Sequence, residues 1–159
     1  MACPRALAAA AAALLCGAAV AQSSARAAIL DAIRPLAAAQ AGQPVRIKVE
    51  RLNRDGDWAL LLGGLVTPSG TQLDWRKARQ CEPELDKLLW AVLRRDATGA
   101  WQLRQLDICA PEPPYWNLEQ FGGFVWPCGL YQGLQSAEGA DLAAQCRRQA
   151  ERARRASRP

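Results

Sequence analysis

The chain has 159 residues, of which 50% are hydrophobic, and its formal net charge is +5. This length suits a single domain, and no internal repeat divides it. The sequence contains no histidine, which excludes Ser-His and Cys-His nucleophilic sites, and it lacks the glycine motifs of nucleotide-binding enzymes and serine hydrolases.

Residues 1–21 have the features of a secretory signal peptide. Arg5 supplies a positive charge, residues 6–15 form an apolar run, and Ala19-Val20-Ala21 resembles a cleavage site. The apolar run is too short to span a membrane. We therefore expect a periplasmic or secreted chain that begins at Gln22 and has no transmembrane segment. The alternative is a lipoprotein anchored through Cys16.

A helix is predicted over residues 24–40, with Ser24 as its N-cap. The apolar stripe of this helix comprises Ile29, Ile33 and Leu36, widened by Leu30 and Ala37. Pro35 cannot donate the backbone hydrogen bond of a helix interior, so we expect a kink or a restart there. The kink would either follow a curved sheet or open a ligand pocket beneath it.

Two strands are predicted next. Residues 45–50 alternate between apolar and charged side chains, which indicates a half-buried strand near a sheet edge. Residues 53–57 carry the Asp-Gly signal of a hairpin loop. Residues 58–66 are apolar on both faces and include Gly63-Gly64, which indicates a bend or a close backbone approach.

Residues 88–108 indicate a second hairpin after a long connection over residues 71–86. Residues 88–93 are apolar on both faces, which predicts a central strand covered on both sides. A turn follows at residues 96–99. In the second arm, the apolar positions change phase part-way, so we expect a β-bulge near Gln105.

Four cysteines remain after the signal peptide: Cys81, Cys109, Cys128 and Cys146. An even number in an exported chain predicts two disulfides. The spacing contains no C-x-x-C pair, so no metal site is predicted, and we expect no other cofactor. Three pairings are possible. We favour Cys81 with Cys109, because antiparallel hairpin arms bring these ends together, and Cys128 with Cys146. The other pairings stay open.

Residues 110–133 hold six of the ten aromatic residues of the chain. The prolines and glycines between them argue against a long helix or a regular strand. So many aromatic side chains must either cover one face of the sheet or bind a ligand such as a glycan, a peptide or a hydrophobic partner. The candidate ligand surface is Tyr115, Trp116 and Phe121, whereas Trp126 is expected to belong to the cover.

A C-terminal helix is predicted over residues 136–157, with Ser136 or Asp141 as its cap. The tail, residues 147–159, carries six arginines and one glutamate, whereas residues 22–146 carry 13 basic and 14 acidic residues. Such a tail suits contact with an anionic surface, for example phospholipid headgroups or an acidic polymer. It also suits a solvated helix end. Nucleic acid is not an expected partner of an exported chain.

The expected fold is α+β, with an N-terminal helix packed on a curved four-stranded antiparallel sheet, a disulfide-stapled cover and a short C-terminal helix. Asp57-Trp58-Ala59-Leu60 and Gly99-Ala100-Trp101-Gln102-Leu103 resemble strand segments of small NTF2-like proteins. Over residues 24–108 the chain resembles cystatin-like or NTF2-like α+β domains, and as a whole it resembles small exported bacterial proteins. Catalytic NTF2-like members commonly use Asp and His inside the sheet, so without histidine no catalytic residue is carried over.

We expect residues 22–146 to form one domain that acts as a non-catalytic binding or accessory module of the cell envelope. Its partner would be an envelope protein, a glycan or an anionic surface. The alternative is a small-ligand pocket or an enzyme in the concave face of the sheet. In that case Glu50, Asp74 and Asp107 are the carboxylates that could meet there.

Overall fold

The structure is a computed structural model that describes the backbone of residues 8–157 and the side chains of residues 24–157. The cleavage site and the lipoprotein alternative at Cys16 lie outside the described side chains. Among the described residues, no helix combines the length and the apolar character that a membrane crossing requires.

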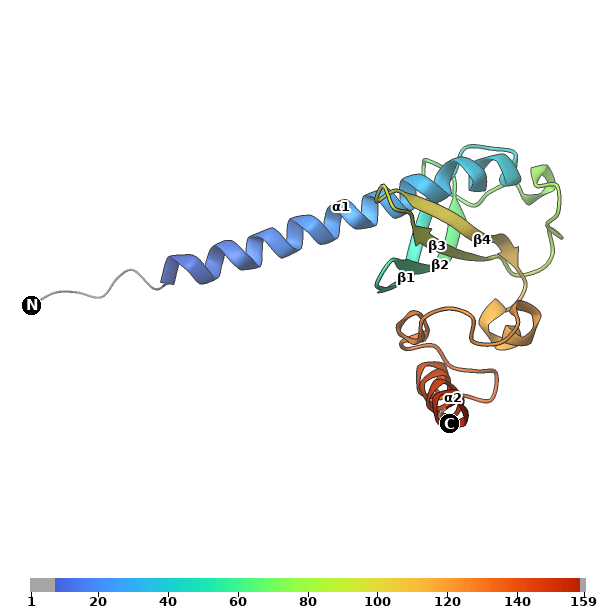
Figure 1. The fold of residues 1–159 in the computed structure, drawn as a ribbon. Helices are drawn as coiled ribbons and strands as arrows, with labels where there is room; N and C mark the ends of the chain where they lie inside the picture. Colours follow the sequence, from blue (N-terminus) through green and yellow to red (C-terminus); the bar gives the residue numbers. More distant parts are fainter. Residues whose placement is uncertain (1–7, 158–159) are drawn as a thin grey trace, which may run out of the picture.

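Four strands form one antiparallel sheet in the order β1-β2-β3-β4, and helical segments flank it. The elements are α1 (Ala8–Ala41), β1 (Arg46–Asp55), β2 (Trp58–Val66), β3 (Leu88–Arg95), β4 (Trp101–Ala110) and α2 (Leu142–Ala156), with short 3₁₀ turns η1 (Trp75–Lys77), η2 (Pro114–Phe121) and η3 (Cys128–Tyr131). The end of α1 lies across one side of the sheet, and the chain after β4 lies on the other (Figure 1). This arrangement confirms the predicted α+β fold.

The first hydrophobic core lies between α1 and the sheet. Ile29, Ile33 and Ala37 are fully buried there, because residues four apart share one helix face. They pack against alternate residues of β2 and β3, namely Ala59, Leu61, Leu89, Ala91 and Leu93. Leu36, predicted to belong to this stripe, is instead 50% exposed, since it lies one residue off the line of contact.

A second core lies on the opposite face of the same two strands. Leu60, Leu62, Trp90 and Val92 point into it and meet Leu118, Leu130, Tyr131, Leu134 and Leu142 of the C-terminal segment. The two central strands are therefore buried on both faces, as their continuous apolar runs predict.

β-Bulges set the phase of the edge strands at two positions, and a further register shift lies between Leu88 and Trp90 in the β3–β4 pairing. In β4, Val92 pairs with Gln105 and Leu93 with Leu103, so Arg104 is the extra residue next to the expected position. In β1, Val49 pairs with Gly63 and the following pair begins at Arg51, so Glu50 is extra. The second bulge has no clear signal in the sequence, and it turns the end of β1 toward the C-terminal cover.

Gly63 marks a close backbone approach, as expected of the Gly63-Gly64 pair. A Cβ atom added at Gly63 would lie 2.1 Å from the carbonyl oxygen of Lys48. No side chain fits there, so glycine is required for β1 and β2 to pair at this point.

Both helices differ in extent from their predictions. α1 begins at Ala8 and runs without interruption through Pro35, so Ser24 lies inside it rather than capping it. Pro35 is exposed, and the carbonyl that it leaves unpaired can therefore be solvated. α2 begins after Asp141, whose Oδ1 accepts a hydrogen bond from the Ala144 amide at 2.9 Å. Ser136 closes the preceding turn instead, accepting from the Ala140 amide at 3.2 Å.

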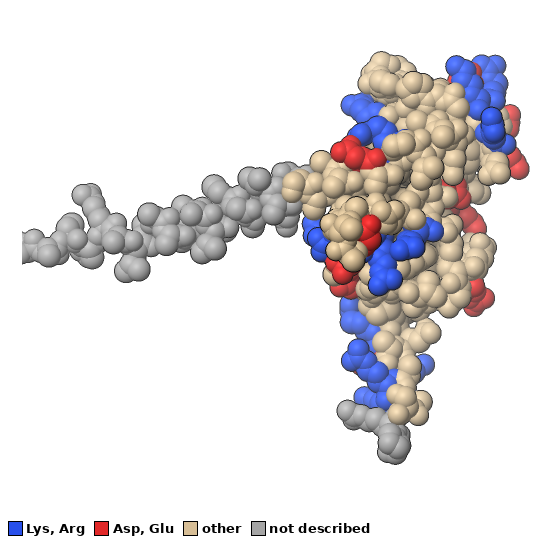
Figure 2. Space-filling view, turned by 45° about the horizontal axis from the view of Figure 1, so that its top comes forward, with Lys and Arg blue, Asp and Glu red and all other residues tan. Residues whose placement is uncertain are grey.

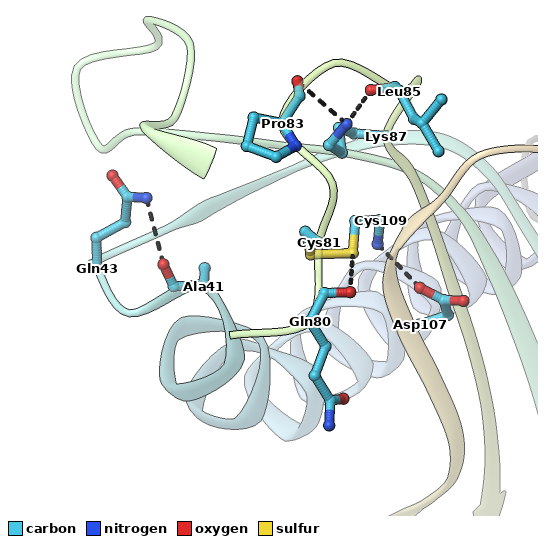
Figure 3. The surroundings of a disulfide bond; sticks show 9 residues. All are labelled: Ala41, Gln43, Gln80, Cys81, Pro83, Leu85, Lys87, Asp107 and Cys109. Carbon is cyan, nitrogen blue, oxygen red and sulfur yellow. Dashed lines mark hydrogen bonds between the residues drawn. A yellow bond between two sulfur atoms is a disulfide. The ribbon is translucent and has the colours of Figure 1, made fainter. Parts of the chain in front are cut away.

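The structure contains the two disulfides that the sequence favoured. Cys81–Cys109 links the connection before β3 to the end of β4 (Figure 3). Cys128–Cys146 links η3 to α2. In the chain-entropy model, loops of these lengths stabilise the fold by about 3–4 kcal/mol each. The second bridge fixes the C-terminal helix to the cover.

Candidate functional site

A groove lies between η2 and α2 on the outside of the C-terminal cover, with a volume of ≈ 740 Å³. Its walls combine one exposed indole with amide and carboxylate side chains. The exposed indole and the amide and carboxylate side chains discussed below belong to Trp116, Glu119, Gln120, Glu138, Gln145 and Gln149. The groove is therefore both aromatic and polar.

Trp116 is the exposed aromatic residue of the groove, which Tyr115 and Phe124 also line. Its side chain is 43% exposed, and its indole Nε1 donates a hydrogen bond to the Gln135 carbonyl oxygen at 3.1 Å. This bond holds the ring in one orientation at the surface. A ligand that stacks on the indole face would meet a ring that is already ordered.

Some polar side chains of the groove are held by hydrogen bonds within the protein, and others are available to a ligand. The Ser136 hydroxyl donates to Glu138 Oε2 at 2.8 Å, and this hydrogen bond lowers the pKa of the Glu138 carboxyl. Within residues 24–157, the side-chain amides of Gln120, Gln145 and Gln149 have no protein hydrogen-bond partner. These three amides can donate to and accept from a ligand.

Of the three aromatic residues predicted to form the ligand surface, only Trp116 is exposed. Tyr115 and Phe121 are half-buried, and their ring centroids lie 5.9 Å and 6.4 Å from that of the buried Trp90. Tyr115 and Leu118 pack against the second core while Trp116 is exposed, and the backbone of η2 changes direction between them at Asn117. Tyr115 still borders the groove, whereas Phe121 does not.

The cover beneath the groove is tied to the edge of the sheet by polar contacts. Asn53 Nδ2 donates to the carbonyl oxygens of Leu130 and Gln132, both at 2.8 Å. Asp55 Oδ2 accepts from the Gly129 amide at 2.9 Å. The sequence suggested only a hairpin loop for residues 53–57. The role of Asn53 and Asp55 depends on the bulge at Glu50, which was not foreseen.

Two polar atoms are buried in the core below the groove. Trp90 Nε1 and Tyr131 Oη have no hydrogen-bond partner within the usual limits, although both side chains are fully buried. Burial raises the pKa of Tyr131 to about 12, and the Trp126 backbone offsets part of that effect. Tyr131 is thus held neutral and contributes packing.

The three carboxylates considered for catalysis do not meet. Glu50 lies in β1 and Asp107 in β4, the two edge strands, so about 14 Å of sheet separates them. Asp74 caps η1 and its Oδ1 accepts from Arg76 Nε at 2.8 Å. The face of the sheet below α1 is covered mainly by core side chains. A pocket of ≈ 460 Å³ between the end of α1 and β4 is lined by Asp107 but not by Glu50 or Asp74. Among the described residues no group of three or more potential metal ligands occurs.

Comparison of the chain with protein-family models, with curated proteins and with solved structures found no match. Its function is therefore inferred from the chemistry of the groove.

Proposed function

We propose that the protein is a non-catalytic binding module of the cell envelope that holds a glycan chain in the groove between η2 and α2. The observation that carries this proposal is the exposed Trp116 ring, fixed by its hydrogen bond to Gln135 and bordered by amide side chains. A periplasmic or secreted location is supported by the two disulfides, which persist in oxidising compartments.

A sugar ring matches this combination of groups. Its C–H face is apolar and stacks on an aromatic ring, while its hydroxyl groups both donate and accept hydrogen bonds. The groove offers the indole of Trp116 for the first interaction and the amides of Gln120, Gln145 and Gln149 for the second. A purely apolar ligand would leave these amides unpaired, which is unfavourable.

The Glu138 carboxyl suits hydrogen bonding to a ligand better than acid catalysis. Glu119 and Glu138 both line it, and glycosidases commonly use two carboxyl groups. One of them acts as the acid and requires a raised pKa. In this protein the hydrogen bond from Ser136 lowers the pKa of Glu138, so Glu138 is ionised at neutral pH and serves as a hydrogen-bond acceptor.

The test is retention on purified peptidoglycan, together with calorimetric titration of soluble N-acetylglucosamine oligomers. Trp116→Ala should weaken binding about tenfold or more, because it removes the stacking surface, and Trp116→Phe should keep most of the affinity. Val125→Ala is the matched control, since Val125 is 51% exposed in the same segment and does not line the groove.

Two results would contradict the proposal. One is binding by Trp116→Ala that equals wild type. The other is a large fall in its melting temperature with no specific loss of affinity, which would assign Trp116 to the cover.

A further inference from the structure

α2 leaves the body of the protein part-way along its length. Leu142, Ala143 and Cys146 are buried at its start, whereas almost every residue over 147–157 is exposed. Figure 2 shows basic side chains along this projecting C-terminal segment. The outer part of α2 thus presents its side chains to solvent or to a partner.

This outer part is strongly basic. It carries five arginines and one glutamate: Arg147, Arg148, Arg152, Arg154, Arg155 and Glu151. Within residues 24–157, none of the five arginines forms an ion pair. Their charge is therefore not neutralised by the protein itself.

Helix stability does not account for the whole cluster. Cations in the last turn interact favourably with the helix dipole, and this effect explains Arg154 and Arg155. It does not extend beyond the last turn, so it does not explain Arg147, Arg148 and Arg152. These three suit an external anionic partner.

The shape of the basic surface points to an extended partner. At about 100° per residue, the five arginines span an arc of roughly 160° on the side of α2 opposite Leu142 and Cys146. Gln145 and Gln149, which line the groove, lie outside this arc. The basic face extends for about 14 Å along the helix, and only its Arg148 and Arg152 edge borders a hollow.

We propose that this basic ridge, residues 147–155 of α2, docks on the surface of an anionic phospholipid bilayer. A planar surface of phosphates can contact the ridge along its whole length, and guanidinium groups bind phosphate oxygens through paired hydrogen bonds. Ala150 and Ala153 offer too little apolar area to insert between acyl chains. The contact is therefore electrostatic. One edge of the ridge adjoins the glycan groove, because Arg148 and Arg152 line a shallow hollow together with Gln145 and Gln149.

The experiment is co-sedimentation of the full-length protein with vesicles of phosphatidylcholine alone or mixed with phosphatidylglycerol. Wild type should bind only the mixed vesicles, and high ionic strength should release it. Each cation near such a surface contributes about fivefold in affinity. Arg148→Gln/Arg152→Gln/Arg155→Gln should therefore bind about 100-fold more weakly.

The matched control neutralises three arginines elsewhere, in Arg54→Gln/Arg79→Gln/Arg104→Gln. All three are exposed and lie outside α2, so vesicle binding should be close to that of wild type. Equal loss in both triple variants would overturn the proposal, because net charge alone would then be responsible. Absence of wild-type binding to the mixed vesicles would also overturn it, including the case in which the protein binds soluble heparin instead.

Discussion

Trp90 is the residue around which the C-terminal cover is arranged. It is fully buried in β3, and the ring centroids of Tyr115, Phe121 and Trp126 lie 5.8–6.4 Å from its own. Aromatic pairs at such distances contribute about 0.5–1.5 kcal/mol each beyond the area that they bury. Three aromatic residues of the cover thus stabilise the fold by packing on a single indole, whereas Phe124 packs edge-on against Tyr131.

Trp126→Ala should destabilise the protein far more than Trp116→Ala. Trp126 contacts Trp90, Phe121 and Tyr131, so its truncation leaves a cavity and should cost about 3 kcal/mol. For a chain of this size, that loss lowers the melting temperature by about 6–12 °C. Thermal unfolding followed by circular dichroism measures both variants, and equal melting temperatures would contradict this assignment of roles.

Asp96 should make the β3–β4 turn sensitive to acid. Its Oδ1 accepts from the Thr98 hydroxyl and from the Thr98 and Ala100 amides, and Oδ2 accepts from Gln102. The hydrogen bond from Thr98 is the main cause that lowers the pKa of Asp96 to about 2. The unfolded value is about 3.9, so the stabilisation is complete above about pH 4 and is lost as the pH falls through about 2.

The measurement compares urea unfolding of wild type and Asp96→Asn between about pH 2 and pH 6. The advantage of wild type should be constant at the upper end and should shrink toward the lower end. A difference between the two proteins that does not change with pH would show that the ionised carboxylate is not involved.

The exposure of a single residue could be predicted where its neighbours in the sequence determine its surroundings. The sequence assigned Trp116 to the candidate ligand surface and Trp126 to the cover, and in the structure Trp116 is exposed while Trp126 is half-buried. Tyr115 and Phe121 are half-buried, and the change of direction of η2 at Asn117 that contributes to this has no clear signal in the sequence. Sequence hydrophobicity cannot tell an aromatic residue that packs inward from one that points outward in such a turn.

Among the elements, α2 depends most on a single covalent link. Only its start is buried, and Cys146 in that part is bonded to Cys128. In Cys128→Ala/Cys146→Ala, we expect the protein to lose about 3 kcal/mol of stability. α2 should separate from η2, so the groove should lose one wall.

Hydrogen exchange and glycan retention test this expectation. Amides of residues 128–156 should exchange faster in the double variant, while those of β2 and β3 stay protected, and retention on peptidoglycan should fall. Cys81→Ala/Cys109→Ala is the control, because that bridge lies on the far side from the groove-forming elements. Retention that is equally weak in both double variants would mean that the second bridge has no particular role in the groove.

Among the secondary-structure elements, the strands were easier to predict than their β-bulges. Alternation and turn signals located all four strands, and the change of phase in β4 located its bulge. The bulge at Glu50 was missed because β1 keeps a regular alternation up to that residue. The position of this bulge is set by the close approach of Gly63 in β2 to Lys48 in β1. Such a contact between two strands cannot be recognised in the sequence of either strand by itself.

For the whole molecule, the sheet is shared by two cores. Alternate residues of β2 and β3 contribute to the core under α1 and to the core under the C-terminal cover. The apolar runs of these strands predicted that both faces are covered. They could not predict the groove, since it arises where η2 and α2 meet outside the cover, and that arrangement depends on contacts between residues far apart in the sequence.

This shared sheet has a consequence for biosynthesis. A chain synthesised from its N-terminus completes α1 and the four strands before the cover is available. Until Cys146 arrives and joins Cys128, the face that carries Leu60, Leu62, Trp90 and Val92 stays open to water and to other chains. Such a surface is prone to aggregation, so slow oxidation of the last cysteine pair should lower the yield of folded protein more than any weakness of the finished fold.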